Sequence, residues 1–171
     1  CEQQEYSFEK TYGYDLRYAN RERAPIPTRP GVVSYCHDEC LKQADRCRSF
    51  VIEYGQNQQQ SCFFLDEAAS EHRNQLNRSP GSVYSEKICL RTKPCSKLWS
   101  FERYIGYTLD LEPDKSIPSI VTRTACQDLC LSETEFTCRS ATFDYGKRIC
   151  SLFTTTRRSK PDAFKQTTNG D

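Results

Sequence analysis

Two stretches of the chain decide its fold, because each repeats the other. The first reads SYCHDECLKQADRCRSFVIEYGQNQQQSCFFL at residues 34–65, and the second reads TACQDLCLSETEFTCRSATFDYGKRICSLF at residues 124–153. Four cysteines align between the two stretches, and both carry a CRS tripeptide and a Tyr-Gly pair. Self-similarity of this kind indicates two copies of one structural unit. We therefore expect a duplicated module.

The borders of the two modules follow from the cysteine that opens each copy. Cys1 stands ahead of the first copy, and Cys95 stands ahead of the second. We expect one domain at residues 1–90 and another at residues 94–171. The tether between them is short, and Pro94 stiffens it.

The cysteine content predicts an extracellular protein. The chain holds 11 cysteines, two histidines and no methionine. Such a density is typical of small domains in oxidising compartments, where disulfides supplement a modest core. Reduced buried thiols and a zinc site are the alternatives. The sequence has no C-x-x-C pair and too few histidines for the usual zinc ligand sets, so we expect no metal and no cofactor.

Charge and hydropathy exclude further classes. The chain has 24 Lys and Arg against 23 Asp and Glu, which argues against a uniformly basic nucleic-acid-binding protein. No apolar run approaches the roughly 20 residues that a transmembrane helix needs. We expect any signal peptide or membrane tether to lie outside residues 1–171. The protein is then secreted or the ectodomain of a membrane-anchored protein, and its oligomeric state stays open.

Each copy has the pattern of one helix. Ser34 and Thr124 are the expected N-caps, and Thr124 with Gln127 fits the spacing of a capping box. We expect the two helices to end near Asp45 and Glu133. The two cysteines in each helix, four residues apart, then share one face.

The remaining pattern is that of β-strands. The opening segments near residues 7–19 and 100–111 each predict one strand or two. We expect further strands near residues 48–54, 62–65 and 83–89 in the first copy and near residues 139–145 and 150–153 in the second. Phe50, Ile52 and Tyr54 alternate along one of them, which predicts a half-buried strand. Residues 21–31 are rich in Pro and Arg and are expected to be irregular. The predicted fold class is α+β, with one helix packed across an antiparallel sheet in each module.

The six cysteines of the first copy allow many disulfide connectivities, and sequence alone cannot choose among them. Cysteines four apart on a helix are badly placed to bond to each other. The short separation of Cys40 and Cys47 favours a bridge between them, and Cys36 then crosses to Cys62. The expected pairs are Cys1–Cys89, Cys36–Cys62 and Cys40–Cys47, with Cys126–Cys150 and Cys130–Cys138 in the second copy.

These features, taken in order, resemble the PAN or apple domain. The resemblance is carried by an opening cysteine, a helix with C-x-x-x-C, CRSF followed by a Tyr-Gly turn, CFFL at residues 62–65 and VYSEKIC at residues 83–89. It covers nearly the whole chain, as one complete and one incomplete copy. The resemblance implies a non-catalytic module that binds proteins or carbohydrates, and the family's nested six-cysteine bridging agrees with the pairs above.

Three functions are compatible with this resemblance. FERYIGYTLDL at residues 101–111 and CQDLCL at residues 126–131 are most similar to the tandem PAN domains of zona pellucida domain-containing cuticle and apical matrix proteins. An assembly module of such a matrix is the first hypothesis. A ligand-capturing adhesin or growth-factor-type module is the second, with a receptor or sulfated glycan as partner. A regulatory segment of a larger secreted protease is the third.

The second copy departs from the first at its closing strand. No cysteine follows Cys150 within residues 151–171, so Cys95 has no partner in this fragment. We expect Cys95 to pair with a cysteine beyond Asp171 in the longer protein. A disulfide between two chains is the alternative.

Few residues are candidates for a site. We expect no catalytic residue, because His37 stands beside a bridged cysteine and has no Ser or Asp partner at a recognisable spacing. Two basic groups could contact sulfated glycans or an acidic protein, or could be ordinary solvated charge. They are Arg17, Arg21, Arg23 and Arg29, and Lys147, Arg148, Arg157, Arg158 and Lys160. Asn77 begins a glycosylation sequon, which Pro80 follows directly, so its use stays open.

Overall fold

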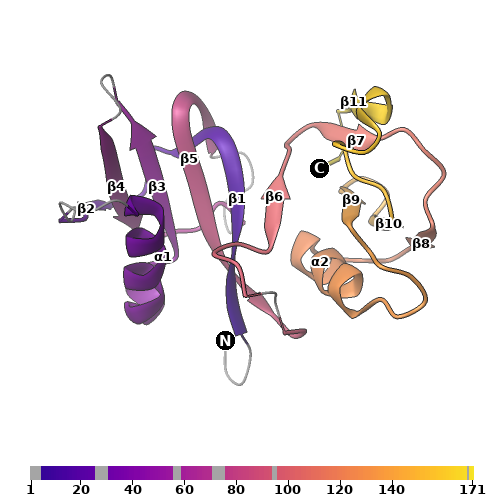
Figure 1. The fold of residues 1–171 in the computed structure, drawn as a ribbon, viewed down its shortest axis with the longest axis horizontal. Coiled ribbons are helices and arrows are strands. Elements are labelled where there is room, and N and C mark those ends of the chain that lie inside the picture. Colours follow the sequence, from indigo (N-terminus) through magenta and orange to yellow (C-terminus); the bar gives the residue numbers. More distant parts are fainter. Residues whose placement is uncertain (1–4, 26–30, 56–58, 71–75, 94–95, 169) are drawn as a thin grey trace. The chain divides into compact units, whose positions relative to one another are not determined.

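The chain forms two units in a computed structural model, which describes residues 5–25, 31–55, 59–70, 76–93, 96–168 and 170–171 (Figure 1). The first unit comprises Tyr6–Ile88 with Cys95–Arg103, and the second comprises Tyr104–Asp171 with Cys89–Pro94 and Cys1–Glu5. Each has an α-helix and a mainly antiparallel sheet in its described part. The expected α+β class is confirmed.

The first unit is built on a six-stranded sheet. Its strands are β1 (Glu5–Leu16), β2 (Arg21–Arg23), β3 (Ser49–Tyr54), β4 (Gln60–Leu65), β5 (Leu76–Leu90) and β6 (Phe101–Arg103), in the order β2-β4-β3-β5-β1-β6. β3 pairs antiparallel with β4 and with β5, whereas β6 joins β1 in parallel. β5 is longer than the closing strand expected at residues 83–89.

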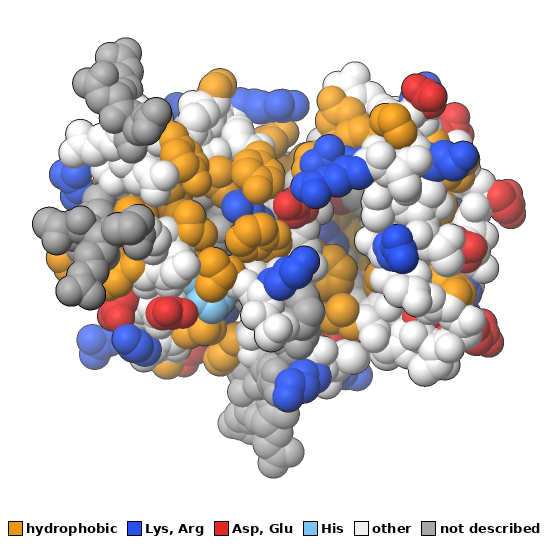
Figure 2. Space-filling model, in the orientation of Figure 1, with side chains coloured by type: hydrophobic (Ala, Val, Ile, Leu, Met, Phe, Trp, Pro, Cys, Tyr) orange, Lys and Arg blue, Asp and Glu red, His pale blue; other side chains and the backbone are white. Residues whose placement is uncertain are grey.

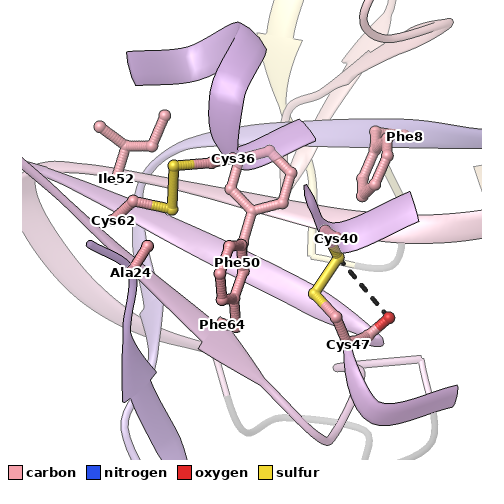
Figure 3. Packing of buried hydrophobic residues seen from close by; sticks show 9 residues of the cluster. All are labelled: Phe8, Ala24, Cys36, Cys40, Cys47, Phe50, Ile52, Cys62 and Phe64. Atoms are coloured by element: carbon pink, nitrogen blue, oxygen red, sulfur yellow. Dashed lines mark hydrogen bonds between the residues drawn. A yellow bond between two sulfur atoms is a disulfide. The ribbon is translucent and has the colours of Figure 1, made fainter. Parts of the chain in front are cut away.

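One face of this sheet packs against α1 (Val32–Lys42). The helix contributes Cys36 and Cys40, and the strands contribute Phe8, Phe50 and Ile52 among others. Figure 3 shows the Phe50 ring between the two disulfides that join this helix to its neighbours. Both helix cysteines are fully buried, as expected for one shared face.

The opposite face of the sheet is buried as well. Val51 is fully buried and packs with Leu65, Leu16 and Tyr84 in a second core, which Ala69 helps to cover. The expectation of a half-buried strand at β3 is therefore wrong. The alternation of Phe50, Ile52 and Tyr54 identified the face toward the helix. Val51, on the opposite face, is also apolar, and it is covered by the second core.

Both helices begin earlier than expected, α1 by three residues and α2 by two. α1 follows Gly31, whose φ of 114° is one that side chains rarely adopt. α2 (Arg123–Ser132) is capped by Thr122, whose Oγ1 accepts a hydrogen bond from the Ala125 amide at 3.1 Å. The predicted caps at Ser34 and Thr124, and the capping box at Thr124 and Gln127, are wrong, because these residues lie inside the helices.

A lysine from the sheet holds the end of α1. The helix ends at Lys42 and leads into the short 3₁₀ helix η1 (Ala44–Arg46). Lys87 Nζ donates to the carbonyls of Cys40 at 2.7 Å and Ala44 at 2.8 Å. The Cys40 carbonyl is among the acceptors that α1 leaves unsatisfied at its C-terminus, and Ala44 begins η1.

Residues 21–31 are more regular than expected where the structure describes them. β2 pairs with β4, with Glu22 opposite Phe64, so the irregular reading is wrong at residues 21–23. An edge strand tolerates a nearby proline because one side of its backbone needs no partner. Residues 26–30, including Arg29, lie outside the described part.

The second unit has a smaller sheet. Its elements are β7 (Tyr107–Leu109), β8 (Lys115–Ile117), α2, β9 (Ser140–Asp144), β10 (Ile149–Phe153), the 3₁₀ helix η3 (Pro161–Ala163) and β11 (Phe164–Gln166). The strand order is β8-β10-β9, and β7 pairs separately with β11. Phe143 and Leu152 pack with the cysteines of α2 to form the core. β9 is therefore an edge strand, whereas its counterpart β3 lies inside a sheet.

The segment at residues 100–111 forms two strands, one in each unit. Phe101–Arg103 is β6 of the first unit, and Tyr107–Leu109 is β7 of the second. Gly106 lies between them with a φ of 76°. Ser100 donates its amide to the Phe8 carbonyl at 3.0 Å, which fixes the start of β6 against β1.

Candidate functional site

Four cysteine pairs are bonded in the described part of the chain. They are Cys36–Cys62 and Cys40–Cys47 in the first unit, and Cys126–Cys150 and Cys130–Cys138 in the second. The Cα separations lie between 5.2 and 6.5 Å, the range that disulfides require. These pairs coincide with those expected from the spacing. Cys36–Cys62 and Cys126–Cys150 tie each helix to a strand of its sheet, whereas Cys40–Cys47 and Cys130–Cys138 tie it to the segment that leads into the next strand.

The remaining cysteines are only partly described. Cys89 is disulfide-bonded. Cys1 and Cys95 lie outside the described residues, so the Cys1–Cys89 bridge and the pairing of Cys95 both stay predictions.

Residues at the end of the sequence pair with the free edge of β9, where a closing strand of the second unit is expected. Phe143 donates to the Asp171 carbonyl at 2.8 Å, and the Asp171 amide donates back at 3.2 Å. Phe143 corresponds to Ile52 in the repeat alignment, and Ile52 is paired with Val83 of β5. Asp171 thus pairs with β9 at the position where Val83 of β5 pairs with β3. This equivalence supports the expectation that a closing strand of the second unit pairs with β9.

We expect residues 1–171 to carry one free thiol per chain, because 11 cysteines cannot all pair within one molecule. Thiol titration of the unfolded protein without reductant should find this thiol, and peptide mapping should place it at Cys95. In a longer protein that includes the next cysteine, the same titration should find no free thiol. One free thiol at Cys95 there, or a covalent dimer that dissociates on reduction, contradicts pairing within one chain and supports the link between chains.

The first basic group is partly neutralised. Arg21 donates to Asp15 at 2.5 Å and to Glu53 at 3.5 Å. Its guanidinium also lies over the Phe63 ring, 5.0 Å from the centroid. These contacts hold β2 against the sheet, so Arg21 is engaged in structure rather than offered to a ligand.

The other arginines of this group are dispersed. Arg23 donates to the Ser61 hydroxyl at 3.3 Å, and Arg17 donates to the Arg78 carbonyl at 3.5 Å. Arg29 lies outside the described residues. The structure does not gather this group into one cationic surface in its described part.

The second basic group is divided by a strand. Lys147 and Arg148 lie in the turn before β10, while Arg157, Arg158 and Lys160 follow its far end. Five strand residues extend about 16 Å, at about 3.3 Å per residue. The five residues therefore form two smaller sets, and four of them are exposed.

Arg157 belongs to an aromatic row that the sequence analysis missed. Its guanidinium lies 4.4 Å from the Tyr104 ring centroid. Phe164 packs edge-on against Tyr104 at 5.5 Å and stacks on Tyr107 at 4.6 Å. All four side chains are partly exposed. The available signal was the aromatic spacing of YIGY at residues 104–107.

A second missed feature lies in the first unit. Lys10 is only 7% exposed, and its Nζ lies 3.9 Å from the Trp99 ring centroid and 4.7 Å from that of Tyr12. We call Lys10, Tyr12 and Trp99 the aromatic-lysine cluster. Periodicity could place Lys10 and Tyr12 on the face of Phe8, but Trp99 comes from the far side of the tether.

The described residues contain no cluster of metal ligands. His37 Nδ1 lies 2.9 Å from Asp38 Oδ1, and the His37 ring packs at 4.8 Å from that of Phe8. The neighbouring Cys36 is in a disulfide. These contacts place His37 in packing, with no nucleophile beside it in the described part.

Asn77 lies in β5 and is partly exposed. Its glycosylation is untested and stays a prediction. Among the described helices, none combines the length and apolarity that crossing a bilayer requires.

The two disulfide-stapled α+β units, with aromatic and basic groups at their surfaces, define a class of small binding module. The family model of the PAN domain matches residues 1–89 and 95–171. The chain belongs to the PAN domain family. PAN domains are typically non-catalytic and bind proteins or carbohydrates outside the cell. No curated protein matches this chain.

Proposed function

We propose that the chain is a tandem adhesive module of an apical extracellular matrix or cuticle protein, where it binds protein or glycan partners. The observation that carries this proposal is the duplication of a disulfide-stapled PAN domain. Two linked binding modules raise the effective concentration of the second contact once the first has formed. Such avidity suits attachment to a repetitive matrix polymer.

The proposal is tested with a solubilised apical matrix, separated into a protein fraction and a glycan fraction. Immobilised protein of residues 1–171 should retain components of at least one fraction at physiological salt. The same protein, reduced and alkylated, is the control for the folded modules. Equal retention by the native and reduced proteins, or none by either, contradicts the proposal.

A second candidate function is capture of a sulfated glycan by the second unit. Arg157 stacked on Tyr104, with Arg158 and Lys160 beside it in sequence, favours this candidate. A guanidinium recognises sulfate through paired N–H donors, and the adjoining rings offer apolar surface. The basic residues at the opposite end of β10 provide a matched comparison.

We expect the double substitution Arg157→Ala and Arg158→Ala to weaken heparin binding about thirtyfold, because each cation near an anionic surface contributes about 1 kcal/mol and about 1.4 kcal/mol is a factor of ten. The change should appear as earlier elution from a heparin column. Lys147→Ala with Arg148→Ala removes the same charge at the other end of β10 and should shift elution less. Equal shifts for both pairs, or elution of the unmodified protein below physiological salt, contradict a specific site at Arg157.

A further inference from the structure

The aromatic-lysine cluster lies on the helix-facing side of the first unit's sheet. Phe8 of β1 belongs to the core beneath α1. Lys10 and Tyr12 follow at intervals of two residues and therefore face the same side. Trp99 packs against the same core. Figure 2 shows hydrophobic side chains gathered on this face, over β1 and β5.

Lys10 has an unusual environment for a lysine. The side chain is more than nine-tenths buried, yet its ammonium makes no ion pair or hydrogen bond with any described residue. Buried lysines are normally paired with a carboxylate. Two aromatic rings compensate part of the cost through cation–π contact. The three N–H donors of the ammonium are left for an acceptor from outside the chain.

An open strip adjoins Lys10. Tyr54 of β3 and Tyr12 of β1 are 42% and 43% exposed, and β5 lies between these two strands. Gly81 of β5 is exposed, and a side chain there would contact the Tyr54 carbonyl. Because Gly81 has no side chain, the middle of this strip is a depression between the Tyr12 and Tyr54 side chains.

The contacts between β1 and β5 place Gly81 beside Tyr12. Arg78 lies over the Tyr14 ring at 4.9 Å, and Lys87 lies over the Tyr6 ring at 5.2 Å. The two strands therefore run in opposite directions, and Gly81 falls close to Tyr12. Two strand spacings separate the tyrosines by about 10 Å, which is room for one sugar ring.

We propose that this strip binds an acidic sugar, with its carboxylate or sulfate on the Lys10 ammonium and the apolar face of its ring on Tyr12. The proposal rests on the proposed binding function and names the ligand class of one site. A ligand group that reaches this ammonium must be small, because two rings flank it, and anionic, because the ammonium is a cation. The exposed tyrosine rings and the glycine then favour a flat, partly apolar ring next to that anion, a combination that an acidic sugar has.

Trp99 makes the site depend on the segment after the tether. Ser100 bonds to the Phe8 carbonyl at 3.0 Å, and the hydroxyls of Ser7 and Ser100 lie 2.6 Å apart. β6 then continues in parallel pairing along β1. The first repeat therefore lacks one wall of the site unless the start of the second repeat pairs with its sheet.

Trp99 is the sole tryptophan of the chain, so its fluorescence reports on this site. The protein of residues 1–171 is titrated with a heparin hexasaccharide, which carries sulfate and carboxylate, and with a hyaluronan hexasaccharide, which carries carboxylate alone. A neutral chitin oligosaccharide and an oligoglutamate peptide are the comparisons. At least one acidic sugar should give a saturable change in fluorescence, and the chitin oligosaccharide should give none.

Lys10→Met keeps the length and packing of the side chain and should weaken the acidic sugar at least tenfold. Lys42→Met is the matched control, because Lys42 is an exposed lysine paired with Glu39 on α1, and it should change affinity less than twofold. Thermal unfolding establishes that both variants are folded. If Lys10→Met does not fold, Tyr12→Leu replaces it with the same expected loss.

Equal affinities for Lys10→Met, Lys42→Met and the unmodified protein overturn the proposal, as does equal binding of the neutral sugar. A response to oligoglutamate with none to either acidic sugar also overturns it and assigns the strip to a protein ligand. Heparin retention that depends on Arg157 and Arg158 without a change at Trp99 overturns this site and leaves the proposed function standing.

Discussion

Replacing Cys36 and Cys62 together by alanine is expected to lower the free energy of unfolding of the first unit by about 3–4 kcal/mol. The bridge spans 26 residues, and loop-closure entropy of the unfolded chain accounts for a loss of this size. Both sulfurs are buried in the core beneath α1, so the substitution also removes packing volume.

The matched comparison is the Cys40–Cys47 bridge, which spans only seven residues. Its double alanine variant should lose about 2 kcal/mol on the same loop-entropy argument. Urea unfolding followed by circular dichroism measures both, with Lys42→Ala as an exposed control that should stay within about 0.5 kcal/mol. A larger loss for the short bridge than for the long one contradicts the proposed role of Cys36 in tying the helix to the sheet.

The bonded pairs could be predicted because cysteine spacing and helix geometry constrain each other. Cys36 and Cys40 lie one helical turn apart on a single face of α1. Cys47 follows Cys40 by only seven residues, so its nearest available partner is Cys40. The same two constraints act in the second copy. Disulfide geometry tolerates little displacement, so an approximate helix favours these partners, although the sequence alone leaves other connectivities open.

The helix ends were not predictable in the same way. The expected caps were chosen by residue type, and serine is a more common N-cap than glycine. The cap of α1 is nevertheless Gly31, which has a left-handed conformation. In α2, the choice between Thr122 and Thr124 depends on which hydroxyl reaches an amide, and Thr122 bonds to Ala125. Backbone path rather than composition decides such boundaries.

Non-local pairing accounts for what else the sequence analysis missed. The segment at residues 100–111 is predicted as one strand or two, all within the second copy, because a local pattern reports only on neighbours along the chain. Its first part pairs with β1, about ninety residues earlier, with Phe101 opposite Glu9. That pairing brings Trp99 to Lys10. No local pattern carries this contact, so the aromatic-lysine cluster emerges only in three dimensions.

Tyr84→Phe is expected to destabilise the first unit by about 2–3 kcal/mol near neutral pH. The Tyr84 hydroxyl accepts from the Ala69 amide at 2.8 Å and donates to Glu86 Oε2 at 3.0 Å. Tyr84 and Glu86 are each about 1% exposed, so water cannot replace the lost bonds without opening the core. Removing one partner of a buried charged group carries a cost in this range. Ser85→Ala, also buried on the neighbouring position of β5, is the control and should cost less.

The same hydroxyl predicts how stability changes in alkali. Burial, with a further contribution from the Glu86 carboxylate, raises the pKa of Tyr84 well above its ordinary value of 10.0. Above about pH 10 the unfolded chain releases this proton while the folded protein retains it, so stability falls as pH rises, by at most about 1.4 kcal/mol per pH unit. Below pH 10 the contribution is fully present.

Urea unfolding at pH 8 and pH 11 should therefore show a difference in the free energy of unfolding between the unmodified protein and Tyr84→Phe that is smaller at the higher pH. Taking the difference between the two proteins cancels the titration of the other tyrosines and the lysines, which they share. A gap of the same size at both pH values contradicts a buried, neutral Tyr84 that holds Glu86.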